Sequence, residues 1–121
     1  MSKKMNGVTI IDVGGDLDHR GMVDLKNAIT SLAEGGDFAI VLNLRGVRHA
    51  NLMSIGVLVD ELRFVREKGG DIRLAGLRKD LTKVFNDVGT DKIFKSYRNL
   101  KEAVGSFKTY AGGINTIGQG G

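Results

Sequence analysis

The sequence predicts an α/β domain with a mainly parallel central sheet of about four to five strands and about four helices packed on it. Short β-branched or apolar segments alternate with longer segments whose apolar residues recur at helical spacing. The 121 residues are 41% apolar, which suits a single core. We expect one domain over residues 1–110. The glycine-rich tail over residues 111–121 lacks the apolar content to order itself, so we expect it to be disordered.

The sequence of the first half of the chain predicts a strand, then a helix, then a second strand. Residues 8–13 are short and β-branched, which is typical of a strand. A helix follows, and the pair Gly35-Gly36 ends it. Its apolar stripe comprises Met22, Leu25, Ile29 and Leu32. Residues 38–44 are almost continuously apolar, which indicates a strand buried on both faces.

The same order continues after a loop over residues 45–50. Gly69-Gly70 ends a second helix, and residues 71–77 alternate as a strand would. Gly89 is placed to cap the end of a third helix. The apolar stripes of these two helices comprise Ile55, Leu58, Leu62 and Val65, and then Leu81, Val84, Phe85 and Val88.

The last folded segment is a fourth helix. Residues 93–94 before it suit a short strand or a turn. Asn99 is a favourable N-cap, and Glu102 stands three residues later as its capping-box partner. The predicted buried side comprises Leu100, Ala103, Val104 and Phe107.

Composition excludes several classes of function. The chain has no cysteine, which rules out disulfides, zinc–thiolate sites and thiol catalysis. Residues 1–7 are polar and lack the apolar core of an export signal, and no apolar run approaches the roughly 20 residues that span a bilayer. We therefore expect a cytoplasmic protein without a membrane span. The net charge of +4 is spread along the chain, which suits an acidic partner or ordinary solvation.

Polar residues gather in two loops, over residues 14–20 and 45–51, which follow predicted parallel strands and so lie where α/β sheets bind ligands. Asp16 is interpreted as the end of a strand, and Asp18 as the start of a helix. A metal or catalytic site would need His19 and His49 to join them, but no spacing supports it. We expect no cofactor.

The sequence favours neither a phosphate-binding loop nor a nucleic-acid-binding surface. No glycine-rich segment has the Gly-Lys-Ser/Thr ending of a phosphate-binding loop. The basic residues lack interleaved aromatic residues and a recognisable reading helix, so nucleic-acid binding is not expected.

The start of the second helix is the most informative segment. Asn51 is a good N-cap, and Leu52, Met53 and Ser54 would form the first turn, where backbone N–H groups lack partners and the helix dipole is positive. A phosphate there would be well held and would add nearly two negative charges, which makes the turn suitable for a charge switch. The alternative is structural: Leu52 and Met53 form an apolar first turn, and Ser54 helps the cap.

Several motifs together resemble the STAS domain family, especially bacterial anti-sigma factor antagonists. The run Gly15-Asp16-Leu17-Asp18 is similar to the family's Gly-Glu-Leu-Asp motif. Residues 40–44 followed by Val47 resemble its central strand and loop, and residues 51–58 align with its Asp-Ser-Ser-Gly-Leu-Gly-Val-Leu segment. The likeness extends over about residues 8–107.

The resemblance implies a regulatory module, not an enzyme. It implies binding to an anti-sigma factor, a serine kinase of ATPase fold, which releases a sigma factor; phosphorylation of a serine at the start of the second helix ends the binding. Aligned on Gly56, the acceptor position is Met53, the acidic position is Asn51, and Ser54 replaces the first glycine. The phospho-switch is therefore lost, or it has moved to Ser54, about 100° around the helix. We expect loss.

The resemblance also implies which residues bind the partner, and it requires Leu52 and Met53 to be exposed. The predicted partner-binding residues are Asp16, Asp18, Arg20, Arg45, Arg48, Asn51, Leu52, Met53, Ser54 and Gly56. Three alternatives remain: a STAS-type scaffold or regulator of a transport or signalling complex, a small enzyme or ligand-binding protein, and a nucleic-acid-binding protein.

Overall fold

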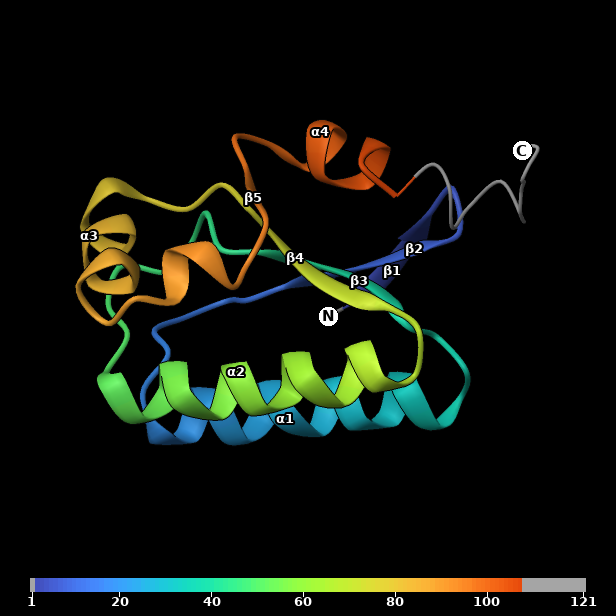
Figure 1. Cartoon of the computed structure of the whole chain (residues 1–121), viewed down its shortest axis with the longest axis horizontal. Helices are drawn as coiled ribbons and strands as arrows, with labels where there is room; N and C mark the ends of the chain where they lie inside the picture. The colour runs from blue at the N-terminus through green and yellow to red at the C-terminus, as the bar shows by residue number, and fades with distance from the viewer. Residues whose placement is uncertain (1, 108–121) are drawn as a thin grey trace.

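The structure, a computed structural model, describes residues 2–107 and has a five-stranded sheet with helices on both faces (Figure 1). The strands lie in the order β1-β2-β3-β4-β5; β1 is antiparallel to β2, and the other neighbours are parallel. The predicted α/β class is therefore confirmed. The elements are β1 (Ser2–Met5), β2 (Val8–Asp12), α1 (His19–Glu34), β3 (Ala39–Asn43), α2 (Leu52–Glu67), β4 (Asp71–Ala75), α3 (Lys79–Asp87), the 3₁₀ turn η1 (Thr90–Lys92), β5 (Ser96–Tyr97) and α4 (Leu100–Gly105).

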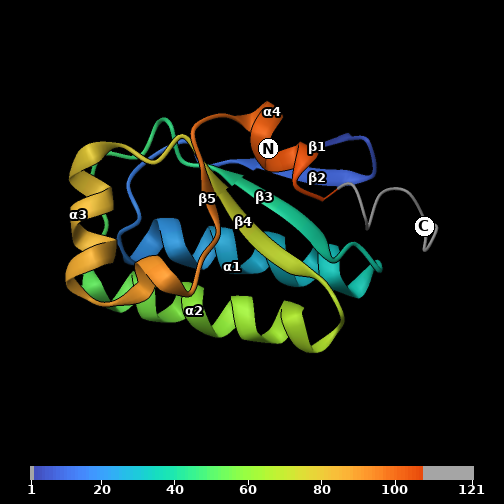
Figure 2. The same cartoon turned by 45° about the horizontal axis from the view of Figure 1, so that its top comes forward.

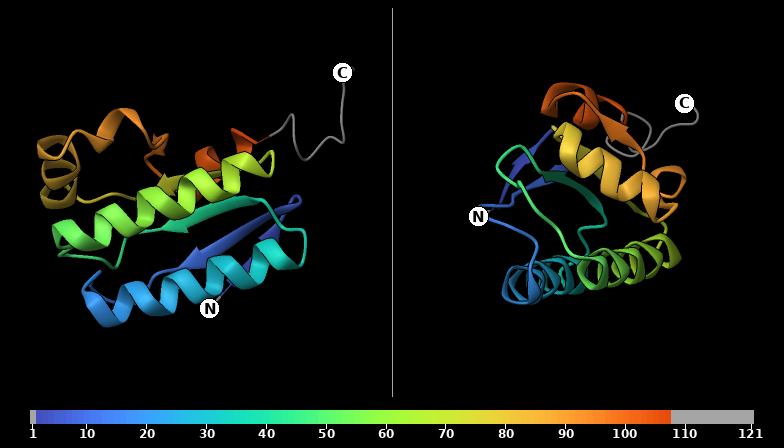
Figure 3. Two further views of the ribbon diagram at one scale, coloured as in Figure 1. Left: turned by 60° about the horizontal axis from the view of Figure 1, so that its bottom comes forward. Right: turned by 90° about the vertical axis from the view of Figure 1, so that its left-hand side faces the viewer.

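The helices form two layers, one on each face of the sheet. Helices α1 and α2 lie side by side against one face, and α4 covers part of the other (Figures 1 and 3). The larger core lies under α1 and α2, where their apolar stripes meet β3 and β4; Leu81 and Phe85 of α3 join it. A smaller core under α4 is centred on Val41, Val104 and Phe107. None of the helices in this described part combines the length and apolar character needed to cross a bilayer.

Strand β4 is buried along its whole length, so the polar residues in its alternating pattern do not face solvent. Asp71 and Arg73 lie on the α4 side, where the Asp71 carboxylate accepts hydrogen bonds from Arg73 Nε and Arg66 Nε, each at 2.9 Å. The Arg73 guanidinium also donates to the Ser106 carbonyl at 2.6 Å and stacks 4.0 Å from the ring centre of Phe107. This network joins the end of α2, the start of β4 and the end of α4.

Strand β1 has no counterpart in the prediction, because its residues are mostly polar and show no strand pattern. Asn6 and Gly7 both have positive φ, at 52° and 80°, and connect Met5 to its partner Val8 in a tight hairpin. The Asn-Gly pair is a strong sequence signal for such a turn. Figure 2 shows the added strand at the edge of the sheet beside β2.

Other boundaries differ slightly from the prediction. Phe94 lies in a turn and packs edge-on against Phe85, with ring centres 5.9 Å apart; the fifth strand comes later, at Ser96–Tyr97. Gly89 adopts a left-handed conformation one residue beyond the helix cap. The predicted cap of α4 is confirmed, since Asn99 Oδ1 accepts the Glu102 N–H at 2.9 Å. The predicted tail, residues 111–121, lies outside the described residues.

Glu61 is a buried acid on α2. Its Oε1 has no hydrogen-bond partner within the described part of the chain. Burial raises the pKa of Glu61 above its ordinary value of 4.5; the positive charge of Lys26 opposes this rise, and the negative charge of Asp60 adds to it. The buried carboxylate therefore costs stability at neutral pH.

Replacing Glu61 with glutamine should stabilise the fold in a pH-dependent way. Well below pH 4.5 the carboxyl is protonated in folded and unfolded chains alike, so the variant gains nothing. As the pH rises from there through the raised folded-state pKa, the unfolded chain loses its proton first, which destabilises the native protein. We expect Glu61→Gln to be about 1 kcal/mol more stable at pH 7 by urea unfolding. The same change at exposed Glu67 is the control, and an equal gain at all pH values would contradict this account.

Candidate functional site

The first turn of α2 presents two large apolar side chains to solvent. Asn51 caps the helix, with its Oδ1 accepting the Ser54 N–H at 2.8 Å. Leu52 is 64% exposed and Met53 is 83% exposed, which confirms the exposure that the predicted surface requires. Ser54 is only 3% exposed, because it turns inward with the buried side of the helix. The start of α2 reaches beyond the ends of the strands (Figure 1), which is why Leu52 is exposed although it continues the apolar stripe.

The loop before α1 is tied to the loop before α2 by backbone and side-chain hydrogen bonds. Leu17 pairs with Ala50 as an isolated parallel bridge: the Leu17 N–H donates to the His49 carbonyl at 2.9 Å, and the Asn51 N–H donates to the Leu17 carbonyl at 3.3 Å. Asp16 Oδ1 accepts the N–H groups of Arg48 and His49, each at 3.2 Å. These bonds hold the starts of both helices in a fixed relation.

The two aspartates of the first loop have different structural roles. Strand β2 ends at Asp12, so the interpretation of Asp16 as a strand end was wrong; its carboxylate instead joins the two loops. The prediction for Asp18 is confirmed: it is the N-cap of α1, and its Oδ1 accepts the Gly21 N–H at 2.8 Å.

A mainly apolar groove of about 290 Å³ runs between the starts of α1 and α2. Met53 forms part of one wall, and Val23, which is itself exposed, forms part of the other. The α1 side of this groove was not predicted from the sequence, although an apolar Val23 directly after the buried stripe residue Met22 was a signal for it. The groove is lined by His19, Met22, Val23, Lys26, Asn51, Met53, Ser54 and Val57.

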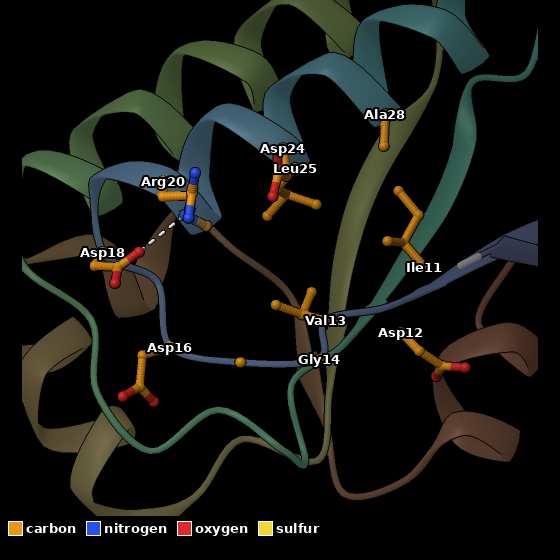
Figure 4. Close-up of a pocket in the computed structure, with 12 residues that line it drawn as sticks. Ile11, Asp12, Val13, Gly14, Asp16, Asp18, Arg20, Asp24, Leu25 and Ala28 are labelled. Carbon is orange, nitrogen blue, oxygen red and sulfur yellow. Dashed lines mark hydrogen bonds between the residues drawn. The ribbon is translucent and has the colours of Figure 1, made fainter.

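An acid-lined hollow of about 450 Å³ lies on the other side of the first loop, between the end of β2 and α1 (Figure 4). The carboxylates around it belong to Asp12, Asp16, Asp18 and Asp24, and they point in different directions (Figure 4). Within residues 2–107, no three His, Asp or Glu side chains gather closely enough to hold a metal ion. Of the histidines considered for such a site, His19 lines the apolar groove, whereas His49 lines a separate shallow hollow.

Three exposed arginines lie in and beside the two joined loops. The guanidinium groups of Arg20, Arg45 and Arg48 have no hydrogen-bond or ion-pair partner among the described residues, and all three residues are exposed. By contrast, Asp12 accepts a hydrogen bond from Asn43 at 2.7 Å, and Asp16 and Asp18 bind backbone N–H groups. These three carboxylates hold the local structure, while the three guanidinium groups have no bonded partner in the described region.

The structure does not bring all the predicted site residues into one hollow. Asn51, Met53 and Ser54 line the groove, whereas Arg45 lines a third hollow with Arg98, on the α4 side. Gly56 is exposed on α2, and a Cβ added there would meet no atom within 4 Å, so packing does not require glycine.

Comparisons with known proteins identify a family for this chain. The family model described as STAS domain matches residues 1–103. The fold is similar to a candidate anti-sigma factor antagonist from Thermotoga maritima, with a TM-score of 0.81 and 23% identity over 88% of this chain and 92% of that chain. It is also similar to phosphorylated SpoIIAA from Bacillus (TM-score 0.67, 18% identity, 88% and 96% covered). A sulfate transporter family protein from Wolinella succinogenes matches at a TM-score of 0.74 and 16% identity, with 89% of each chain covered.

Replacing Asp16 with alanine should loosen the link between the two loops. The change removes an acceptor of two backbone N–H groups, so we expect a loss of about 1 kcal/mol in the free energy of unfolding. Amide exchange at Arg48 and His49 should become faster, because their N–H groups lose that acceptor. The matched control is Asp24→Ala, an exposed aspartate with no hydrogen-bond partner in the described region. Equal effects of the two substitutions would contradict the role assigned to Asp16.

Proposed function

We propose, since the chain belongs to the STAS domain family of binding and regulatory modules, that it acts as an anti-sigma factor antagonist. In this proposal the first turn of α2 and the adjacent groove dock on an ATPase-fold anti-sigma factor, which then releases its sigma factor. The observation that carries the proposal is the exposure of Leu52 and Met53 on a rigidly capped helix start.

The apolar turn has the composition expected at the centre of a protein interface. Large apolar side chains that are fully desolvated on binding supply most of the affinity of such contacts. Here Met53 stands at the edge of a groove, so a partner can bury both the thioether and the groove wall at Val23. The N-cap and the loop pairing fix the turn before binding, which lowers the entropy cost of docking.

The charges around the turn favour an acidic partner. Arg48 lies in the loop that leads into this turn, Arg20 lies in the first turn of the neighbouring α1, and neither guanidinium is paired within the described residues. Complementary carboxylates on the partner would steer association and fix its orientation. The association rate should therefore fall as salt concentration rises.

The phospho-switch is absent from the proposed mechanism. The resemblance puts Met53 at the acceptor position, and a thioether accepts no phosphoryl group. Ser54 is 3% exposed, and in-line transfer demands close and well-oriented approach to the acceptor oxygen. The chain would therefore bind its anti-sigma factor with no phosphorylated off state.

Adding a charge at Met53 should abolish docking. Binding is measured against purified ATPase-fold anti-sigma factors from the organism that carries the gene, by calorimetry. We expect Met53→Glu to weaken binding at least 100-fold, because a carboxylate would be desolvated among apolar groups. Met5→Glu is the matched control: Met5 is exposed but lies at the opposite end of the sheet, paired with the first residue of β2. Loss of binding with both variants, or with neither, would reject the proposed surface.

The same anti-sigma factors also test whether the chain lacks the phospho-switch. Incubated with kinase and ATP, the native chain should gain no phosphate by mass spectrometry, while Met53→Ser should gain one because it places an exposed hydroxyl at that position. A phosphate mapped to Ser54 of the native chain would show that the acceptor has moved and that Ser54 can leave its buried position.

A second candidate function is favoured by the likeness to the sulfate transporter family protein. In this alternative the same exposed turn docks on a transport or signalling complex, without sigma-factor control. Co-purification with a membrane transport complex through a contact that Met53→Glu breaks, together with no binding to any anti-sigma factor, would favour it.

A further inference from the structure

We propose that Met53 is a peroxide-oxidisable modification site and that its conversion to the sulfoxide weakens docking. The second half of this statement rests on the proposed function, because it assigns a form of regulation to the same surface. The first half concerns the chain alone and stands on the placement of its sulfur atoms.

The methionines of the described region differ widely in their exposure to solvent. Met53 is 83% exposed, Met5 is 41% exposed and Met22 is 3% exposed. Thioether oxidation requires an oxidant to reach the sulfur, so its rate should follow this order. The sequence contains no cysteine, so no thiol within the chain competes for the oxidant.

The reaction balances with a hydroperoxide as oxidant. With hydrogen peroxide, a sulfur lone pair of Met53 attacks one peroxide oxygen and the O–O bond breaks. The departing hydroxide then takes the proton from the oxygen now bound to sulfur, which gives water and the sulfoxide. The sulfur is oxidised by two electrons to the sulfoxide, and the peroxide is reduced by two. Methionine sulfoxide reductases reverse the change, so the modification can work as a switch.

Because Met53 lies at the wall of the docking groove, its oxidation should weaken docking. Oxidation replaces a flexible apolar side chain by a polar one at the wall of the apolar groove that Met22, Val23 and Val57 also line. A partner that buries this side chain would also have to desolvate the polar S=O group, which opposes docking. We expect about tenfold weaker binding, which is less than a full negative charge would cause.

Docking and oxidation must oppose each other. If the sulfoxide binds the partner more weakly than the thioether does, then by thermodynamic linkage the partner disfavours the sulfoxide form to the same degree. The bound partner also covers the sulfur, so Met53 should be oxidised more slowly in the complex than in the free chain.

The first arm of the test maps oxidation in the isolated chain. The protein is treated with dilute hydrogen peroxide, quenched over time, and analysed by peptide mass spectrometry. We expect the sulfoxide to form at Met53 several-fold faster than at Met5, with Met22 reacting only after unfolding. Equal rates at Met53 and Met5 would overturn the site assignment, whatever the result of any binding experiment.

The second arm measures docking after the peroxide has been removed. The oxidised native chain should bind the anti-sigma factor about tenfold more weakly, and a sulfoxide reductase should restore the binding. Met53→Leu, whatever its starting affinity, should bind equally before and after peroxide, while Met5→Leu should behave like the native chain. Undiminished binding by oxidised native protein would overturn the switch, whereas absence of binding before oxidation would reject the proposed function instead.

Discussion

The parallel pairing of Leu17 with Ala50 joins the loops that lead into α1 and α2, and the proposed surface depends on it. Asp16 strengthens the same link by accepting the N–H groups of Arg48 and His49. Because the two loops are joined, both helices start side by side beyond the end of the sheet (Figure 3). An apolar groove lies between their first turns. Met53 is then left at the groove edge with its side chain in solvent.

Helix α2 is held at its far end as well. Arg66, in its last turn, bonds to the buried Asp71 carboxylate at the start of β4, which in turn holds Arg73. The Asp71–Arg73 pair is buried and costly to break, and the partly exposed Arg66 ties the end of α2 to it, so the helix that carries the exposed first turn is fixed at its far end. A surface fixed in this way loses little conformational entropy on binding, and a single change at Met53, such as an added oxygen or charge, acts on affinity directly.

The sequence predicted the class and order of the parallel strands and long helices, because helical spacing and apolar runs are local signals. It did not predict β1, although Asn6-Gly7 carried a turn signal, because polar residues gave no strand pattern. The exposure of Leu52 and Met53 followed only from the family resemblance, since an apolar first turn suits a buried helix equally well. The α1 wall of the groove and the role of Asp16 depend on contacts between residues about 30 positions apart, which periodicity does not report.

Amide hydrogen exchange of the chain, free and bound to its anti-sigma factor, tests the central claim most directly. If the first turn of α2 and the joined loops form the docking surface, added protection should be confined to residues 14–23 and 45–57, with no change in the β1–β2 hairpin or in α4. Protection centred on the hairpin or on the α4 face, with the first turn of α2 still exchanging as in the free chain, would contradict the account.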